Sequence, residues 1–187
     1  RKGQWGGFWR DPELRATLTA LLGGGLFVSL LLWIKDVYAP LDALRHGMFN
    51  VISIATTTGY ATVDYLGWPV FAPVLLIFLG TFASCAGSTG GGIKMVRMIL
   101  LIKQARRELV RIIHPRVVNP VTLGGQVVPM QVMTAVLGFM LIYGAATMGL
   151  TMLMLFTGVD LVTSFSAVVA TLNNIGPGLG MVGPASN

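Results

Sequence analysis

Two short segments combine hydroxyl or amide side chains with glycine in a pattern suited to holding a dehydrated cation. The first is Thr56-Thr57-Thr58-Gly59-Tyr60, and the second is Asn173-Asn174-Ile175-Gly176-Pro177-Gly178. Glycine permits backbone dihedrals that aim successive carbonyl oxygens in one direction, and rings of such carbonyls can replace the hydration shell of potassium. The segments therefore predict binding positions for a potassium ion at Thr57, Thr58, Asn174 and Ile175, within turns completed by Gly59, Tyr60, Gly176 and Pro177.

Each turn follows an apolar stretch of about ten residues, at 46–55 and at 162–172, which is too short to cross a membrane and favours a re-entrant helix. Bare backbone N–H and C=O groups cost several kcal/mol in lipid, so an irregular turn at this depth is expected to line a pore. The alternative is an extracellular turn with no part in ion binding.

Composition predicts an all-α integral membrane protein. The chain is 54% hydrophobic and 11% charged, with a mean hydropathy of +0.75, whereas soluble domains carry about 25% charged residues. Long stretches with few charges predict spans at about 16–34, 69–110 and 128–157.

Basic residues mark the cytoplasmic side. They gather in residues 1–15 and between 94 and 116, and short loops rich in Lys and Arg stay in the cytoplasm. The lead-in 1–15 and the connection 113–127 are therefore placed inside, and 35–68 and 158–187 outside. Since these charges flank spans, no nucleic-acid partner is expected. The run from 103 to 116 is either a docking surface for a cytosolic partner or only an anchor, and a small hairpin is expected after it.

The two turns align at Gly59 and Gly176, which are 117 residues apart. The alignment predicts an internal repeat made of a span, a short pore helix, a filter turn and a second span. Residues 16–112 form the complete copy, with pore helix and filter at 41–61. Residues 128–187 form a copy with pore helix and filter at 160–180 but no closing span, so the sequence, which begins at Arg1, is interpreted as a fragment.

A glycine-rich run interrupts the predicted span 69–110: Gly87, Ser88, Thr89, Gly90, Gly91 and Gly92. Glycine costs up to about 1 kcal/mol per residue inside a helix, so the helix is expected to break here and turn Ser88 and Thr89 toward water. The alternative is close helix packing through small residues, which is the interpretation given to Gly23-Gly24-Gly25. Lys94 and Arg97 follow the run and are interpreted as anchors at the inner interface, with a contact to the run as the alternative.

Four segments carry a resemblance to a known family: ATTTGYAT, CAGSTGGGIKMVR, RRELVRIIHP and ATLNNIGPGLG. The turn at 57–60 is close to the TVGYG filter of potassium channels, and the order and spacing of the four segments resemble the third and fourth repeats of TrkH-like subunits in the Trk/Ktr/HKT superfamily. The resemblance implies potassium transport through half of a pseudo-fourfold pore, as a channel or a symporter, with residues 87–92 as an intramembrane gate. It also implies a multi-pass bacterial inner-membrane protein, embedded in membrane lipid, that requires the remainder of the subunit, forms a homodimer and binds a cytosolic nucleotide-binding ring.

Two other functions stay open: sodium or mixed-cation transport, against which glycine at 59 and 176 argues, and a non-transporting membrane scaffold. An enzyme is not expected, because His46 and His114 lie far apart and the carboxylates are scattered. Potassium is the one bound species expected, with no covalent cofactor.

Asp42, Asp64 and Asp160 either attract cations to the outer mouth or cap helices, and Asp160 is well placed to cap the helix after it. Partial matches to nucleotide-binding motifs at 87–94 and 178–183 lack the strand that such motifs follow.

Overall fold

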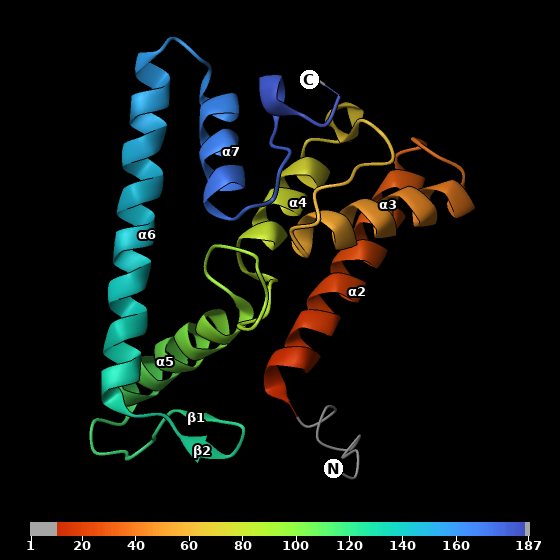
Figure 1. Ribbon diagram of the computed structural model, residues 1–187. Helices are drawn as coiled ribbons and strands as arrows, with labels where there is room; N and C mark the ends of the chain where they lie inside the picture. Colours follow the sequence, from red (N-terminus) through yellow and green to blue (C-terminus); the bar gives the residue numbers. More distant parts are fainter. Residues whose placement is uncertain (1–10, 186–187) are drawn as a thin grey trace, which may run out of the picture.

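The computed structural model describes residues 11–185, so residues 1–10 of the expected lead-in and residues 186–187 lie outside the described part. Helices α2, α3 and α4 gather at one side of the molecule, α6 and α7 stand at the other, and α5 with a small hairpin joins the two groups (Figure 1). The helices are α2 (Pro12–Ile34), α3 (Pro40–Ala55), α4 (Phe71–Phe82), α5 (Met95–Ile113), α6 (Met130–Phe156) and α7 (Leu161–Leu172), with short 3-10 turns η1 (Tyr65–Gly67) and η2 (Gly180–Val182).

Helices α2 and α6 are long and apolar enough to cross a membrane. The most apolar window of each is only 28% buried in α2 and 11% buried in α6, whereas the core helix of a soluble protein would bury most of its apolar side chains. Helix α2 begins at Pro12, earlier than the expected residue 16. The reason is that Asp11 caps it by accepting a hydrogen bond of 2.9 Å from the N–H of Glu13, with proline at the first helical position.

The core lies where α2, α3 and α4 meet, and its fully buried members include Val28, Leu32, Val51 and Ile54. Glycine allows the helices of this group to approach closely. A Cβ at Gly24 would lie 2.7 Å from the side chain of Leu79, and one at Gly25 would collide with Met48. The packing role expected for the first glycine run is therefore confirmed at these two positions.

Helix α3 extends beyond the apolar stretch 46–55. It begins at Pro40 and includes Asp42, Arg45 and His46, so its start lies within one residue of the segment 41–61 predicted for the first pore helix and filter. These polar residues interrupt the apolar pattern of the sequence but not the helix. They share its outward face, while Ala43, Gly47 and Asn50 face inward.

The predicted span 69–110 is interrupted over more residues than expected. Helix α4 ends at Phe82 and α5 begins at Met95, so the break covers residues 83–94 and not only 87–92. We call residues 83–94 the gate loop after the role predicted for 87–92. Hydrogen bonds of 3.0 Å from Ile93 N–H to Thr81 O and of 2.9 Å from Met95 N–H to Ser84 O tie its two ends together. These cross-links satisfy backbone groups that the helix would otherwise have satisfied.

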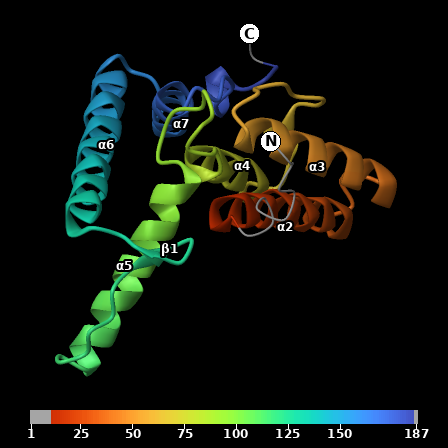
Figure 2. The ribbon, with the colours of Figure 1, turned by 60° about the horizontal axis from the view of Figure 1, so that its bottom comes forward.

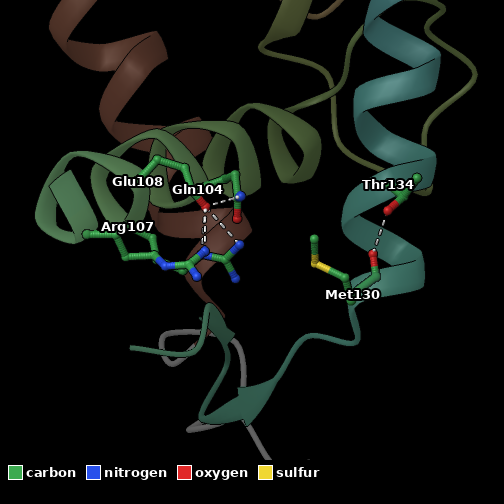
Figure 3. Close-up of polar contacts among 6 residues, drawn as sticks. Gln104, Arg107, Glu108, Met130 and Thr134 are labelled. Atoms are coloured by element: carbon green, nitrogen blue, oxygen red, sulfur yellow. Dashed lines mark hydrogen bonds and ion pairs between the residues drawn. The ribbon is translucent and has the colours of Figure 1, made fainter. Parts of the chain in front are cut away.

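Helix α5 extends away from the helical body and carries most of the basic run (Figure 2). Along it, the carboxylate of Glu108 accepts hydrogen bonds from Arg107 and Gln104 (Figure 3). The expected small hairpin follows as β1 (Thr122–Leu123) and β2 (Gln126–Val127), joined through two glycines at positive φ. Lys103 Nζ donates to Thr122 O at 2.6 Å and fastens the hairpin to α5.

Candidate functional site: two facing turns and the gate loop

Helices α3 and α7, the two predicted pore helices, end in the same hydrogen-bonded turn. After α3, Thr57 N–H donates to Ile54 O at 3.1 Å and Thr58 N–H donates to Ser53 O at 2.8 Å. After α7, the residues 117 positions later repeat this pattern: Asn174 N–H donates to Thr171 O at 3.2 Å and Ile175 N–H to Ala170 O at 2.8 Å. This pairing is the Schellman motif, in which the first residue beyond the helix adopts a left-handed conformation.

The left-handed position is held by residues other than glycine, of which only asparagine adopts it with any frequency. Thr57 has a φ of 58° and Asn174 a φ of 56°. Helices usually place glycine there, and a positive φ at a β-branched residue such as Thr57 is a genuine outlier. Strain of this kind costs on the order of 1–3 kcal/mol and gathers at functional sites, where the surroundings must hold it.

The two turns lie against each other. A Cβ at Gly59 would sit 2.6 Å from the carbonyl oxygen of Ile175, and one at Gly176 would lie 3.6 Å from the Cα of Gly59. Both glycines have positive φ, 81° and 103° respectively. A recess of about 270 Å³ opens beside them and is lined by Gly59, Tyr60, Ala61, Gly176, Pro177, Gly183 and Pro184.

The carbonyl oxygens of these turns are chemically available. Within residues 11–185, the oxygens of Thr57, Thr58, Asn174 and Ile175 accept no hydrogen bond, whereas the neighbouring Asn173 O accepts one from the gate loop. A backbone carbonyl away from bulk water is normally paired. Carbonyl oxygens that accept no hydrogen bond, on two facing turns, can bind a cation in place of its hydration water.

Polar side chains of the first pore helix support the chain that leaves the first turn. The hydroxyl of Thr62 lies 3.0 Å from both Asn50 Nδ2 and His46 Nδ1, and Asn50 also donates to His46 O at 2.8 Å. Sequence reasoning missed this cluster. The i, i+4 spacing of His46 and Asn50 on α3 was the available signal, but nothing local indicated that Thr62 would fold back onto them.

The second pore helix supports its outgoing chain in a comparable way. Ser166 Oγ accepts the N–H of Leu179 at 2.9 Å, and Thr163 Oγ1 accepts the N–H of Met181 at 3.1 Å. The two outgoing chains are also joined, since the fully buried Tyr65 of η1 donates its hydroxyl to Gly178 O at 3.3 Å. None of these three contacts was predicted, and the two residues of a contact lie up to 113 positions apart in the sequence.

The gate loop contacts both turns. Gly91 N–H donates to Asn173 O at 3.0 Å, and a Cβ at Gly90 would lie 2.9 Å from Thr57 Oγ1. Gly87, Ser88 and Thr89 are exposed. The loop occupies the middle of the molecule, between the helical groups (Figure 1).

Two charged side chains, one inside the loop and one from α2, also bond to its backbone. Lys94 Nζ donates to Ala86 O at 3.1 Å and to Ser88 O at 3.2 Å, and Ala86 N–H donates to Glu13 Oε1 at 2.6 Å. Lys94 was interpreted first as an interface anchor. The structure instead gives it the alternative role, because its Nζ donates to two carbonyl oxygens of the loop.

The outer carboxylates do not converge on the turns. Asp64 accepts the N–H of Leu66 at 3.0 Å, and Asp160 accepts the N–H of Thr163 at 3.0 Å as the cap of α7. The predicted cap at Asp160 is therefore confirmed. Its hydrogen bond with Thr163 lowers the pKa of the exposed Asp160 carboxyl below its usual value. Asp42 lies in the first turn of α3, where a negative charge favours the helix dipole.

Comparisons with known proteins agree with the arrangement. A crystal structure titled as the potassium transporter TrkH from Vibrio parahaemolyticus superposes with a TM-score of 0.89 at 42% identity, covering 96% of this chain and 39% of that one. The chain is 43% identical over 176 residues to the Trk system potassium uptake protein TrkH of Salmonella typhimurium, and 37% identical over 171 residues to TrkG of Escherichia coli.

These matches cover nearly the whole chain but only part of the relatives. The aligned region is 94% of this chain and 36% of the Salmonella protein, so the chain spans about a third of the length of its relatives. The sequence model of the TrkH cation transport proteins matches residues 6–186. The chain therefore belongs to the TrkH family of cation transport proteins.

Proposed function

We propose that the chain forms part of a potassium-conducting pathway, in which the turns at 56–60 and 173–178 supply two sides of a carbonyl-lined selectivity filter. The observation that carries this proposal concerns two adjoining turns of matching geometry. Within residues 11–185, their carbonyl oxygens at Thr57, Thr58, Asn174 and Ile175 accept no hydrogen bond. The relatives named above, which are potassium uptake proteins by name, support potassium as the ion. The ion is the transported substrate and is bound only in passage.

The second part of the proposal is that the gate loop obstructs the path below the filter. Its contacts with Asn173 and Thr57 keep it close to both turns, and its exposed residues 87–89 project from the packed body. Glycine at 90, 91 and 92 is required by this closeness, because a Cβ at each would crowd Ser84, Asn173 or Thr81. A loop with backbone so near the path can block it without large side chains.

A complete pathway needs more polypeptide than this chain. Two turns leave the carbonyl ring open on one side, and the relatives are about three times as long. We propose that two further repeats from the remainder of the subunit close the ring, that subunits pair as homodimers, and that a cytosolic nucleotide-binding ring docks on the basic face of α5. The protein would reside in the bacterial inner membrane. The start of α2 and the hairpin lie at one end of the molecule, and the α2–α3 and α6–α7 connections lie at the other (Figure 1), which supports the proposed sidedness.

Ion flux into liposomes tests the proposal on the full-length protein. Potassium flux that exceeds sodium flux supports a potassium filter. Equal fluxes would support the mixed-cation alternative, and no flux of either ion would support a scaffold.

Shortening the gate loop by residues 88–90 tests the gate. We expect higher flux per folded molecule and an unchanged ratio of potassium to sodium flux, because the filter turns keep their own hydrogen bonds. Reduced folding with normal flux in the surviving molecules would instead mean that the loop serves packing.

A further inference from the structure

A buried polar cluster at the start of the second filter turn connects the gate loop to helix α6. At its centre is Asn173, which has no solvent exposure. Its carbonyl oxygen accepts the N–H of Gly91 at 3.0 Å, and its side-chain Nδ2 donates to Val169 O at 2.6 Å and to the hydroxyl of Tyr143 at 2.9 Å. The same hydroxyl lies 3.3 Å from Asn173 Oδ1. One residue thus joins the pore helix, the gate loop and α6.

The gate loop fits tightly on this residue. A Cβ at Gly91 would lie 3.1 Å from the Cα of Asn173, and a Cβ at Gly92 would collide with the Asn173 amide. Gly92 also has a φ of 75°, which favours glycine. The position of the loop's exit arm, residues 91–92, therefore depends directly on where Asn173 is held.

Helix α6 holds the exit arm through a second side chain as well. The ring of Tyr143 stacks on that of Phe139, one helical turn earlier, with centroids 6.1 Å apart. The guanidinium of Arg97 lies 3.9 Å from the centroid of Phe139 and reaches Gly92 O at 3.5 Å. A cation over an aromatic face is attracted by the ring quadrupole. The aromatic pair Phe139 and Tyr143 thus contacts both groups that grip the exit arm.

We propose that Tyr143, acting through Asn173, is a positioning residue that holds the exit arm of the gate loop against the second filter turn and so favours the obstructing position of the loop. The proposal rests on the gate function proposed above. Removing the hydroxyl takes one hydrogen-bond partner from the fully buried amide of Asn173, and a buried polar group that loses its partner is costly. The side chain of Asn173 then reorients to recover a partner, and its close contact with the exit arm at Gly92 loosens.

The test is Tyr143→Phe in the full-length protein, which removes the hydroxyl and keeps the ring on Phe139. The matched control is Thr134→Val on the same helix, because Thr134 donates its hydroxyl only to Met130 O of its own turn, at 3.1 Å (Figure 3). We expect Tyr143→Phe to raise potassium flux per folded molecule about two- to tenfold, the range for one hydrogen bond, with an unchanged potassium-to-sodium ratio. The control should leave both unchanged.

A second comparison separates positioning from a general structural role. In the variant that lacks residues 88–90, Tyr143→Phe should give no further rise, since no obstruction remains to be released. An equal effect in both backgrounds, a changed ion ratio, or no rise with the intact loop would overturn the proposal. If Tyr143→Phe reduces the folded yield, Phe139→Leu tests the same exit arm through Arg97, with the same expected rise. A loop deletion that itself leaves flux unchanged would refute the gate function instead.

Discussion

The two filter glycines are predicted to differ in their tolerance of a side chain. A Cβ at Gly59 would sit 2.6 Å from Ile175 O and must recede by about 0.8 Å to reach ordinary contact at 3.4 Å, whereas a Cβ at Gly176 would already lie 3.6 Å from its nearest neighbour. Both substitutions strain a positive φ, at a cost of about 1–2 kcal/mol. Only the first also forces the two turns apart.

We therefore expect Gly59→Ala and Gly59→Ser to weaken ion discrimination more than Gly176→Ala. The displaced atom is a carbonyl oxygen proposed to coordinate the ion, so its movement changes the difference in binding free energy between potassium and sodium. A change of about 1–2 kcal/mol in that difference lowers the permeability ratio roughly five- to thirtyfold. For Gly176→Ala we expect a smaller loss of the same kind.

Reversal potentials of the full-length protein in mixed potassium and sodium solutions measure this ratio directly. The amount of folded protein, measured by size-exclusion chromatography in detergent, controls for misfolding. An unchanged ratio in both Gly59 variants, or a larger loss in Gly176→Ala, would refute the assignment of these turns to a filter in which they press on each other.

Further predictions concern the supports of the turns and the body of the fold. Thr62→Val should lower the free energy of unfolding by about 1–3 kcal/mol, because it removes a partner of the buried Asn50 side chain, and it should reduce potassium selectivity; normal selectivity in flux assays would place Thr62 outside the filter's support. Gly24→Leu should lower the thermal midpoint, because the new side chain overlaps Leu79 and overpacking costs about 1–3 kcal/mol. The Asp160 carboxylate has a lowered pKa, so it stabilises α7 above the pKa of the unfolded chain, and this contribution disappears as pH falls through the lowered value. The difference in thermal midpoint between the natural protein and Asp160→Ala should shrink over that acidic range, and a difference that grows would contradict the cap. The 187-residue chain alone in liposomes should show no potassium-selective flux, and selective flux would mean that copies of it assemble a complete ring.

Local sequence patterns were enough to predict much of the architecture. The apolar stretches that became α2, α6 and α7 could be read from length and hydropathy, the cap at Asp160 from its place before an apolar run, and the hairpin from Gly124-Gly125. The apolar stretch 46–55 did not by itself mark the start of α3 at Pro40, since Asp42, Arg45 and His46 share one face of an amphipathic helix; the segment 41–61 predicted from the repeat begins within one residue of it. A count of consecutive apolar residues along the chain misses such a helix, because its buried residues share one face and are separated in sequence by polar residues.

The contacts that fix the candidate site depend on residues far apart in the sequence. Tyr65 meets Gly178 across 113 positions, and Tyr143 meets Asn173 across 30. The width of the gate loop likewise depends on hydrogen bonds between its two ends and on a positive φ at Lys94, a residue type that gives no sign of it. Such contacts follow from tertiary packing, so composition and spacing predicted the turns without predicting what holds them.

The central claim is that potassium passes between the two turns in contact with their carbonyl oxygens. Anomalous diffraction from crystals of the full-length protein soaked in rubidium, which scatters anomalously and stands in for potassium, measures this directly. We predict ordered peaks between the turns, within coordination distance of the carbonyl oxygens of Thr57, Thr58, Asn174 and Ile175. Absence of peaks there, with ordered ions elsewhere in the protein, would contradict the account.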